Sequence, residues 1–445
     1  MQSRYQALVD TLAGAIYAGQ LLPGTQLPTH RTLARSHHIS LATATRVYAQ
    51  LAAMGLVSGE TGRGTFVREW NSHPGQGASQ SPVPADILDL NFNAPILPAQ
   101  SDMLRQALRQ LASSGHIDSL LNYQPHAGRS QDRLLFSRFL ACRQLHCAAG
   151  AVHIVTGAQH GLAVTLMSLF KPGDVLAVDS LSYPGFLVLA RQCHLELVAV
   201  PVTDTGPDLN ALEALCARRN VKAFYTMPTM HNPMNWVMTH EDRTRLAQIA
   251  RTRGMLIIED AAYAWLATHA PAPLYQYCPE KTVYITGFSK NIAAGMRVGL
   301  VVAPEDKSSA ITHAIHTTQW NTPALSVCLV AGWIQDGTLA RLERQKRDEI
   351  RERQRLAREI FAGLTVNTHP EACYLWLPLG ENVRDDRVVS ALLQEGVAVS
   401  SAAPFCSTPA RRPHAIRVAL TSVARDQLAK GLKIVRDVIR DYSDR

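Results

Sequence analysis

The chain has 445 residues, which is longer than one small domain and corresponds to about two or three domains. Apolar residues make up 47% and charged residues 18%, the balance of a soluble globular protein. No stretch reaches the roughly 20 apolar residues that cross a bilayer, and the N-terminal sequence MQSRYQALVD has no basic start followed by an apolar core. We therefore exclude a membrane partner and expect a cytoplasmic protein.

The distribution of charged residues and cysteines further limits the partners and the kinds of site that the chain can have. The net charge is +8, and residues 1–70 carry six arginines against three acidic residues. A mildly basic N-terminal region suits a polyanionic partner. The eight cysteines are scattered, none forms a CxxC pair, and none lies before residue 142. This spacing argues against a metal site and a disulfide framework, so reduced thiols are expected.

Residues 1–68 have the pattern of a winged helix-turn-helix. Apolar spacing predicts a first helix over Tyr5–Gln20, which the segment LLPGTQLP ends. Thr29 is expected to cap a second helix, Thr29–Ser36, and Ser40 a third that runs to about Met54. The segment LVSGETGRGTFV predicts two short strands around a Gly-rich turn. Two helices joined by a short turn and followed by a β-hairpin form a DNA-binding motif.

The third helix is expected to enter the major groove of double-stranded DNA, with its first residues near base edges or phosphates. The candidate side chains on this helix are Ser40, Leu41, Thr43, Thr45 and Arg46. Arg63 lies between two glycines at the tip of the hairpin, where the backbone can turn tightly and an arginine can approach a groove. A small helical protein-interaction module remains the alternative for this region.

The run LPTHRTLARSHHISLATATRVYAQLAAMGLVSGETGRGTFV, from residue 27 to residue 67, resembles the GntR family of bacterial regulators. The resemblance implies that Arg31, Thr43 and Arg63 contact DNA. Leu41 departs from the family pattern, which often has arginine at that place. This departure bears directly on how the start of the third helix reads bases.

The remaining chain divides into a linker and a body. Residues 69–88, EWNSHPGQGASQSPVPADIL, are rich in Pro, Gly, Ser and Gln, which predicts a flexible linker. Residues 89–445 alternate short apolar runs with amphipathic stretches, which indicates an α/β domain with a mainly parallel sheet. The predicted buried strands are AVHIVTG, DVLAVDS, LELVAVPV, VKAFYTM, GMLIIED and TVYITGF. The charged segment 341–361 predicts a solvated helix that packs by one apolar stripe, formed by Leu342, Ile350, Leu356 and Ile360.

Several chemically capable side chains follow these strands. Lys290 comes just after TVYITGF, at the carboxyl edge of the sheet, where α/β proteins place ligands. A sheltered lysine can attack an aldehyde and form a Schiff base. Asp260 ends GMLIIED, and a carboxylate there can keep a pyridine nitrogen protonated. Tyr263, about one helical turn on, can face the same site, and Asn232, after VKAFYTM, can donate to a phenolic oxygen.

Further groups at this edge suit an anion and an aromatic ring. The segment TGAQ, residues 156–159, opens a helix, where backbone N–H groups favour a phosphate. Arg297 can add a bidentate contact to that phosphate, and Arg417, in AIRVAL, can clamp a carboxylate. Tyr183, in SYPGF, can stack on an aromatic ring. Taken singly, each group could be an ordinary cap, turn or loop residue, but together they predict one pocket.

The pieces NYQPHAG, TGAQHGL, YPGF, HNP, DAAY, FSK, GMRVG and AIRVAL resemble fold type I enzymes, the class I aminotransferases, across about residues 89–440. The resemblance implies the cofactor pyridoxal 5′-phosphate and a catalytic Lys290 that forms the aldimine. It implies further cofactor contacts from Asp260 (pyridine nitrogen), Asn232 and Tyr263 (phenolic oxygen), Tyr183 (stacking), and Ala158, Gln159 and Arg297 (phosphate). Arg417 would bind the carboxylate of a substrate or effector, and Tyr123 would reach the cofactor phosphate of the other subunit in a dimer.

The chain departs from this pattern at two places. The family usually has serine or threonine three residues before the lysine, where this chain has Gly287. Thr286 or Ser289 would then have to supply one phosphate hydrogen bond, and losing such a bond costs about 1.5–3 kcal/mol. Weaker retention of the cofactor is expected. Asn235 stands where many relatives have glycine after HNP.

A GntR-like head on an aminotransferase-like body resembles the MocR subfamily of bacterial regulators. The resemblance implies a multi-domain homodimer, domain-swapped head-to-tail, with two heads on DNA half-sites. We predict a transcription regulator that senses pyridoxal phosphate, an amino compound, or both through the Lys290 aldimine, with closure of the body moving the heads. The alternative is an active class I aminotransferase, a transaminase, that carries a DNA-binding head. A third possibility is a DNA-binding protein whose body takes no cofactor.

Overall fold

The head consists of helices α1 (Arg4–Tyr17), α2 (His30–Ser36) and α3 (Leu41–Ala53) and the antiparallel strands β1 (Val57–Glu60) and β2 (Gly64–Val67). The computed structural model describes residues 4–17, 20–21, 25–54, 56–60, 64–67, 87–93, 97, 99–113, 117–380, 383–408 and 412–443. The predicted wing-tip Arg63 and residues 69–86 of the predicted linker lie outside these ranges. Thr29 and Ser40 accept hydrogen bonds from the backbone N–H groups of Thr32 and Thr43, so both predicted helix caps are confirmed.

The first helix ends earlier than its apolar spacing predicts. The described helix covers Arg4–Tyr17, and Gln20 lies outside it, because the N–H groups of Gln20 and Leu21 both turn back to the carbonyl of Ala15. The three helices and the hairpin enclose one hydrophobic core, which includes Leu8, Val9, Leu33, Val47, Leu51, Leu56 and Val67. The head is therefore a folded unit with its own buried side chains.

A seven-stranded sheet forms the centre of the large domain. Its order is β4-β10-β9-β8-β7-β5-β6, and its strands are β4 (Val152–Val155), β5 (Val175–Asp179), β6 (Glu196–Val200), β7 (Val221–Thr226), β8 (Leu256–Asp260), β9 (Thr282–Gly287) and β10 (Gly299–Val302). The six predicted strands are present. The unpredicted β10 runs antiparallel to both of its neighbours, and the other pairs are parallel. The mainly parallel sheet is thus confirmed.

Successive residues of the central strands enter different hydrophobic clusters on the two faces of the sheet. In β7, Ala223 and Tyr225 belong to one cluster and Phe224 to the other. The first cluster is covered by α6 (Ala158–Leu169), α7 (Pro184–Gln192) and α11 (Glu305–Gln319), and the second by α8 (Leu209–Arg218) and α9 (His240–Arg253). Helices on both faces leave the carboxyl edge of the strands as the place for a site.

Helices also close the β4 side of the large domain. They are α4 (Gln100–Ala112), α5 (Ser130–Ala141) and α12 (Ala324–Gln335), which pack into a further cluster with β4 and β10. The short helices are η1 (Ile117–Leu121), η2 (Ala149–Ala151), η3 (Ala264–Leu266), α10 (Leu274–Tyr277), η4 (Ala294–Met296) and η5 (Ala403–Phe405). No helix of the described residues is long and apolar enough to cross a membrane. All eight cysteines are free, and Cys142 is exposed.

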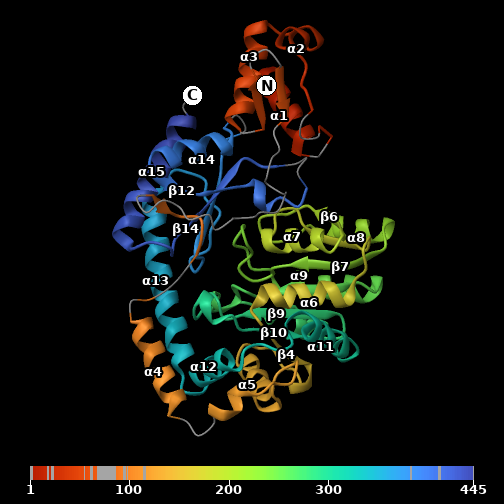
Figure 1. Ribbon diagram of the computed structural model, residues 1–445, viewed down its shortest axis with the longest axis vertical. Helices are drawn as coiled ribbons and strands as arrows, with labels where there is room; N and C mark the ends of the chain where they lie inside the picture. The colour runs from red at the N-terminus through yellow and green to blue at the C-terminus, as the bar shows by residue number, and fades with distance from the viewer. Residues whose placement is uncertain are drawn as a thin grey trace.

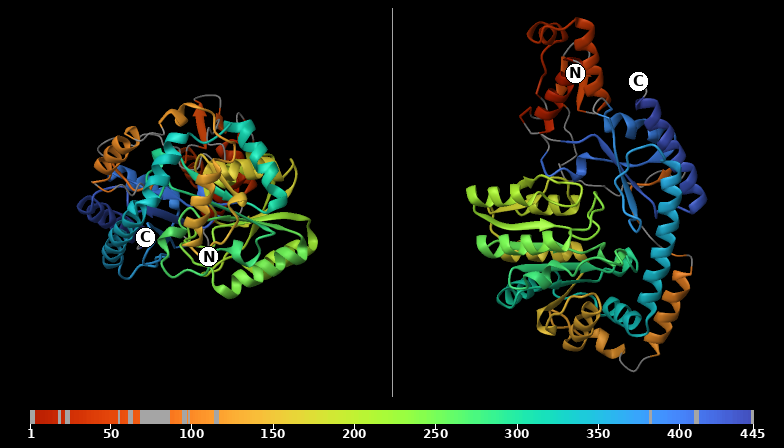
Figure 2. Two further views of the ribbon diagram at one scale, coloured as in Figure 1. Left: turned by 90° about the horizontal axis from the view of Figure 1, so that it is seen from below. Right: turned by 180° about the vertical axis from the view of Figure 1, so that it is seen from behind.

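The small domain follows the long helix α13 (Thr338–Ile360). It contains the sheet β11-β14-β13, formed by β11 (Tyr374–Pro378), β14 (Ala415–Ala419) and β13 (Ser400–Ser401), with helices α14 (Asp385–Gln394) and α15 (Arg425–Ser443). A separate parallel pair joins β3 (Leu88–Asp89) to β12 (Val397–Ala398). In Figure 1 the head lies beyond α14 at one end of the molecule, and the view from behind in Figure 2 agrees.

The prediction that segment 341–361 packs by one apolar stripe was incomplete. The helix α13 begins at Thr338, and its first and last turns enter two different hydrophobic clusters through Leu342 and Ile360. It also buries the polar side chains of Glu343, Lys346, Arg353 and Gln354. These side chains find partners inside the body, and this is why the charged helix is only partly solvated.

Candidate functional site

A cavity of about 370 Å³ opens at the carboxyl edge of the large sheet, between the two domains of the body. Because β4, β5, β7, β8 and β9 point the same way, the segments that follow them meet there. The predicted site residues that line the cavity are Ala158, Gln159, Tyr183, Asn232, Asp260, Tyr263, Ser289, Lys290, Arg297 and Arg417. The sequence therefore identified a set of side chains that the fold brings together.

Lys290 lies at the centre of this set. Its Nζ donates to the backbone oxygen of Asn93 (3.1 Å) and lies 5.8 Å from the centre of the Tyr263 ring. Burial lowers the pKa of the Lys290 amine, and the guanidinium groups of Arg417 and Arg297 lower it further. A larger share of the amine is therefore neutral, the form that attacks a carbonyl carbon.

Asp260 ends β8 and is fully enclosed. Its carboxylate accepts hydrogen bonds from the Tyr225 hydroxyl (2.8 Å) and from the backbone N–H of Ala262 (3.0 Å). Burial raises the pKa of Asp260, whereas these two hydrogen bonds lower it. Tyr225 was not among the predicted residues, because within the run VKAFYTM it resembles any buried aromatic. The sequence carries no signal for this role, because it depends on the pairing of β7 with β8, which sets Tyr225 beside Ile258 on one face of the sheet.

One corner of the cavity contains groups of the kinds that commonly bind an anion. Gly157, with φ 82°, opens α6, and a Cβ there would lie 2.8 Å from Nη2 of Arg297. Arg297 itself has left-handed backbone (φ 48°), and its guanidinium donates to Ser289 Oγ and to the Thr156 carbonyl, both at 3.2 Å. The helix start, Arg297 and Ser289 thus converge on one point.

Close packing accompanies the glycine at position 287, where the family usually has serine or threonine. A Cβ at Gly287 would lie 3.0 Å from the backbone nitrogen of Ala158, which is a tight approach to the start of α6. Thr286 does not substitute for the missing hydroxyl, because its Oγ1 donates to the Ala261 carbonyl (3.3 Å). Ser289 lines the cavity, so of the two candidates it alone is in place.

The side of the cavity opposite the sheet is formed by the small domain. Arg417, on β14, donates to Asn232 Oδ1 (3.0 Å) and to the Asn91 carbonyl (2.5 Å). Its guanidinium carbon lies 4.7 Å from the centre of the Phe405 ring. Neither Asn91 nor Phe405 was predicted, since both come from segments without a sequence motif. Contacts from three distant segments therefore fix the arginine.

Two tyrosines complete the walls. Tyr183 donates to Gln159 Oε1 (3.2 Å), which ties the start of α7 to the start of α6. Burial raises the pKa of both Tyr183 and Tyr263, so both hydroxyls are hydrogen-bond donors at neutral pH. Asn235 adopts left-handed backbone (φ 64°), which asparagine tolerates, and its amide donates to the Asn367 carbonyl (3.2 Å).

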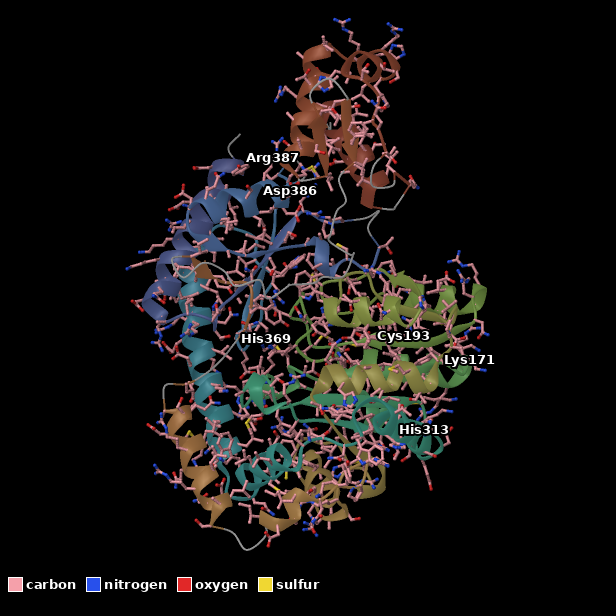
Figure 3. The ribbon with its side chains drawn as sticks, viewed as in Figure 1. Lys171, Cys193, His313, His369, Asp386 and Arg387 are labelled. Atoms are coloured by element: carbon pink, nitrogen blue, oxygen red, sulfur yellow. The ribbon has the colours of Figure 1, made fainter. Side chains whose placement is uncertain are left out.

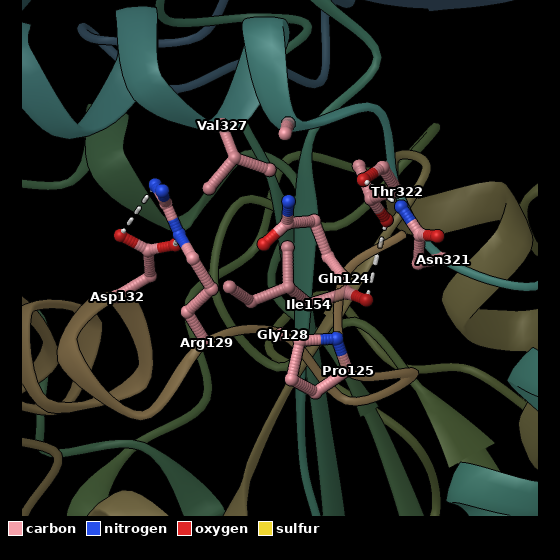
Figure 4. A pocket seen from close by; sticks show the side chains of 10 residues that line it. Gln124, Pro125, Gly128, Arg129, Asp132, Ile154, Asn321, Thr322 and Val327 are labelled. Atoms are coloured by element: carbon pink, nitrogen blue, oxygen red, sulfur yellow. Dashed lines mark hydrogen bonds and ion pairs between the residues drawn. The ribbon is translucent and has the colours of Figure 1, made fainter. Parts of the chain in front are cut away.

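Tyr123 does not line this cavity. It is 84% exposed, and its ring contacts Trp320 at 5.4 Å between centres. Beneath the following segment lies a pocket of about 10 Å³, which has room for no more than a water molecule. Figure 4 shows that the Arg129–Asp132 ion pair closes one side of it. At this volume the pocket offers no ligand site.

The predicted DNA-contacting residues that the structure describes lie on α2, at the N-cap of α3 and on α3. Arg31, Leu41, Thr45 and Arg46 are exposed, and Thr43 is half-buried. Ser40 and Thr43 pair their hydroxyls at 2.8 Å, and Thr45 Oγ1 donates to the Leu41 carbonyl (3.0 Å). The hydroxyls that the sequence suggested for DNA contacts are therefore already engaged within the head.

The head contacts the small domain through the N-cap and the first turn of α14. Arg384 forms an ion pair with Asp10 of α1, and the Arg387 guanidinium donates to the Tyr5 hydroxyl (3.1 Å) and to Gln50 Oε1. Figure 3 shows Asp386 and Arg387 where α14 meets the head. On the head side, Arg46 lies over the Tyr5 ring, 5.1 Å from its centre. One tyrosine thus touches both the body and the third helix of the head.

The comparisons with known proteins agree with this architecture. Residues 85–435 match the family described as aminotransferase class I and II, and residues 4–67 match bacterial regulatory proteins, gntR family. The chain is 26% identical to the uncharacterized HTH-type transcriptional regulator YdeF of Bacillus subtilis, over 99% of this chain and 95% of that one. It is also 26% identical to the uncharacterized HTH-type transcriptional regulator YjiR of Escherichia coli, over 91% and 92% of the two chains.

A solved structure shares the fold of the body. The kynurenine aminotransferase of Pyrococcus horikoshii, crystallised in complex with PMP, matches 80% of this chain and 92% of its own with a TM-score of 0.75 and 20% identity. At this identity the likeness shows the fold alone. Together with the head, it gives the arrangement of a helix-turn-helix regulator fused to a fold type I aminotransferase domain.

Proposed function

Since this chain belongs to the aminotransferase class I and II family and carries a gntR-family domain, we propose that it is a transcription regulator that senses pyridoxal phosphate, an amino compound, or both, at Lys290. The observation that carries the proposal is the buried Lys290 amine, which shares one cavity with an anion-binding corner and the Asp260 carboxylate. The proposal includes the division into head (1–68), linker (69–88) and body (89–445). It also includes a head-to-tail homodimer that binds two DNA half-sites.

The residues of the cavity fit pyridoxal phosphate. The volume of about 370 Å³ is typical of small-molecule sites. Ala158, Gln159, Ser289 and Arg297 would hold the phosphate, and Asp260 the ring nitrogen. Asn232 and Tyr263 would hold the phenolic oxygen, and Tyr183 the ring face. The buried Nε of Arg417 has no hydrogen-bond partner among the described residues, and a ligand carboxylate would satisfy it.

When bound, pyridoxal phosphate supplies an aldehyde that condenses reversibly with the Lys290 amine or with an incoming amine. The chain contributes the rest of the chemistry. Burial keeps a share of the Lys290 amine neutral and nucleophilic, and Asp260 would hold the proton of the ring nitrogen. Arg417 orients a carboxylate against the small domain, so that a ligand with that group would favour one position of this domain.

A line of contacts supports communication between the cavity and DNA. Phe405, beside Arg417, belongs to the short helix η5, and the N–H of Ala402 at its start donates to Asp385 (3.1 Å). Asp385 is the first residue of α14, which holds the head through its N-cap residue Arg384 and through Arg387 in its first turn. We propose that a ligand-dependent movement of η5 shifts α14 and with it the head.

Cofactor attachment tests the proposal directly. The full-length protein should take up pyridoxal phosphate with a visible absorption band, and borohydride reduction should leave one phosphopyridoxyl group on Lys290, located by mass spectrometry. Lys290→Ala should lose both signals, and Lys171→Ala, a surface change far from the cavity, should keep them. Wild-type protein that stays colourless after the addition of pyridoxal phosphate would contradict the proposal.

An active aminotransferase is the second candidate. It is favoured by the joint presence of Lys290, Asp260 and Arg417 around one cavity. Incubation of the protein with amino acids and an oxo-acid acceptor distinguishes the two functions. Sustained multiple turnover on a common amino acid would replace the pure-sensor proposal with an enzyme that carries a DNA-binding head.

A further inference from the structure

The exposed face of α3 carries mainly methyl groups. This helix buries Ala44, Val47, Tyr48 and Leu51 in the core of the head and exposes Leu41, Ala42, Thr45, Arg46, Ala49 and Ala52. In the part of the head that the structure describes, Leu41 is the one large hydrophobic side chain that is exposed (49%). Among the described side chains of α3, five of the six exposed ones therefore end in methyl groups.

The polar groups of this face are directed elsewhere. Thr45 Oγ1 donates to the Leu41 carbonyl (3.0 Å) and lies 3.4 Å from His30 Nδ1. The hydroxyls of Ser40 and Thr43 bond each other, and Ser40 Oγ also caps the helix. Arg46 lies over the Tyr5 ring. The face is thus poorly equipped for hydrogen-bond readout of bases.

Leu41 also lies away from the contact between head and body. The residues of α3 and its C-cap that reach the body are Gln50 and Met54, at the other end of the helix. With a rise of about 1.5 Å per residue, Leu41 is roughly 14 Å from Gln50 along the helix axis. Packing against the body therefore does not account for its exposure.

We propose that α3 reads thymine methyl groups in the major groove, with Leu41 and Thr45 as the specificity-determining residues. The two side chains are four residues apart and so share one face of the helix. The thymine C5-methyl is the apolar group that the major groove presents, and apolar side chains recognise it. The inference rests on the proposed DNA-binding function and adds which base feature the head reads.

The decisive experiment removes single methyl groups from DNA. The bound sequence is first selected from a random duplex library with the full-length protein. Each thymine of the half-site is then replaced by deoxyuridine, which lacks only the methyl group. We expect wild-type affinity to fall about fourfold at one or two positions, the effect of one buried methyl, and to stay unchanged elsewhere.

Protein variants assign each methyl contact. Leu41→Ala should bind the thymine and uracil duplexes equally at one of these positions, while Leu41→Met, which keeps an apolar side chain, should still distinguish them. Thr45→Ser keeps the hydroxyl and loses the methyl, so it should lose sensitivity at a second position, whereas Thr45→Val should retain it. These residues are exposed, so the changes leave the core of the head intact.

The outcomes separate the two levels of the proposal. Tight sequence-selective binding that is insensitive to every uracil replacement overturns the methyl readout but does not contradict the proposed DNA-binding function. Uracil sensitivity that persists unchanged in Leu41→Ala and Thr45→Ser also overturns it. A full-length protein that selects no sequence from the library overturns the proposed function itself.

Discussion

Lys346 is a buried lysine in the middle of α13. Its Nζ donates to the carbonyl of Ile292, two residues after Lys290, at 2.6 Å. Glu343, one turn earlier on the same helix, accepts from Asn291 (2.7 Å). The segment that follows Lys290 is therefore held by two polar side chains of the helix that joins the domains. We infer that Lys346 and Glu343 position Lys290 rather than act on a ligand.

Burial lowers the pKa of Lys346 from its usual 10.5 to about 7, although Glu343 opposes the shift. The unfolded chain keeps the proton up to pH 10.5, whereas the folded chain releases it near pH 7. Folding therefore releases a proton between these values, and a rise in pH over this window favours the folded state.

We expect Lys346→Met to raise the free energy of unfolding at pH 7 by about 1–2 kcal/mol and to remove the increase of stability between pH 7 and 10. The Ile292 carbonyl keeps a donor, because Gln100 Nε2 also bonds it (2.7 Å). Urea unfolding at several pH values measures both effects, with the exposed Lys433→Met as control. A destabilised variant with an unchanged pH slope would mean that Lys346 is charged in the folded protein.

At this scale the sequence was informative wherever chemistry follows a strand. Lys290, Asp260 and Asn232 could be found because polar residues directly after apolar runs must meet at the carboxyl edge of a parallel sheet. Lys346 and Tyr225 could not, because their polar atoms act inside a helix face and a strand that resemble ordinary core. Their roles depend on which segments pack against them, and a single sequence does not contain that information.

The helix α14 contacts the head and belongs to the small domain of the body. Its N-cap residue is Arg384, only 5% exposed in its side chain, and its first turn carries Arg387, which bonds the Tyr5 hydroxyl. Tyr5 in turn supports Arg46 on α3. A change in the position of α14 therefore reaches a predicted DNA-contacting residue through two side chains.

Arg387→Ala should uncouple the head from the body without abolishing DNA binding. Coupling between two sites typically changes affinity about 5- to 150-fold, so in the wild-type protein pyridoxal phosphate should change the DNA dissociation constant by a factor in this range. In Arg387→Ala the ratio of the dissociation constants with and without pyridoxal phosphate should approach one, because the contact that transmits the change is lost. Duplex titration measures that ratio, and Arg436→Ala, on α15 of the same domain, should keep the wild-type value. An Arg387→Ala protein with an unaltered ratio would exclude this route.

Elements with a clear period were predicted with their order and type, and the errors concern their ends and partners. The strand β10 was missed because its four residues, Gly299–Val302, are separated from Arg297 by Val298 alone, without a turn signal between them. The beginning of α13 at Thr338 was missed because the charged pattern by which the helix was predicted starts only at Arg341. In both places tertiary packing decides the structure more strongly than local pattern.

An exposed apolar surface lies around Tyr123 in the described part of the chain, and we propose that a second copy of the chain covers it. Leu121 is 86% exposed, Tyr123 84% and Leu325 48%, and all three line the same shallow hollow. A surface of this kind marks an association site in a soluble protein. The position of Tyr123 outside its own cavity agrees with the proposal that it serves the cavity of a partner.

Leu121→Glu should shift the protein from dimer to monomer and weaken its retention of pyridoxal phosphate at the same time, because a charge would be buried without a partner. Sedimentation velocity measures the first effect and equilibrium dialysis the second. Leu393→Glu, at another exposed leucine (48%) on α14, is the matched control. A Leu121→Glu protein that remains dimeric would place the subunit interface elsewhere.

The helix α13 also determines how the body unfolds. Its 23 residues contribute Leu339 and Leu342 to the core of the large domain and Ala357 and Ile360 to that of the small domain. Fraying at either end of a continuous helix removes hydrogen bonds from the next turn, so loss of one core weakens the other. The two domains of the body should therefore melt in one cooperative transition, and a fragment that ends before α13 should not be a stable folding unit. The head, which has its own core, can unfold independently of that transition.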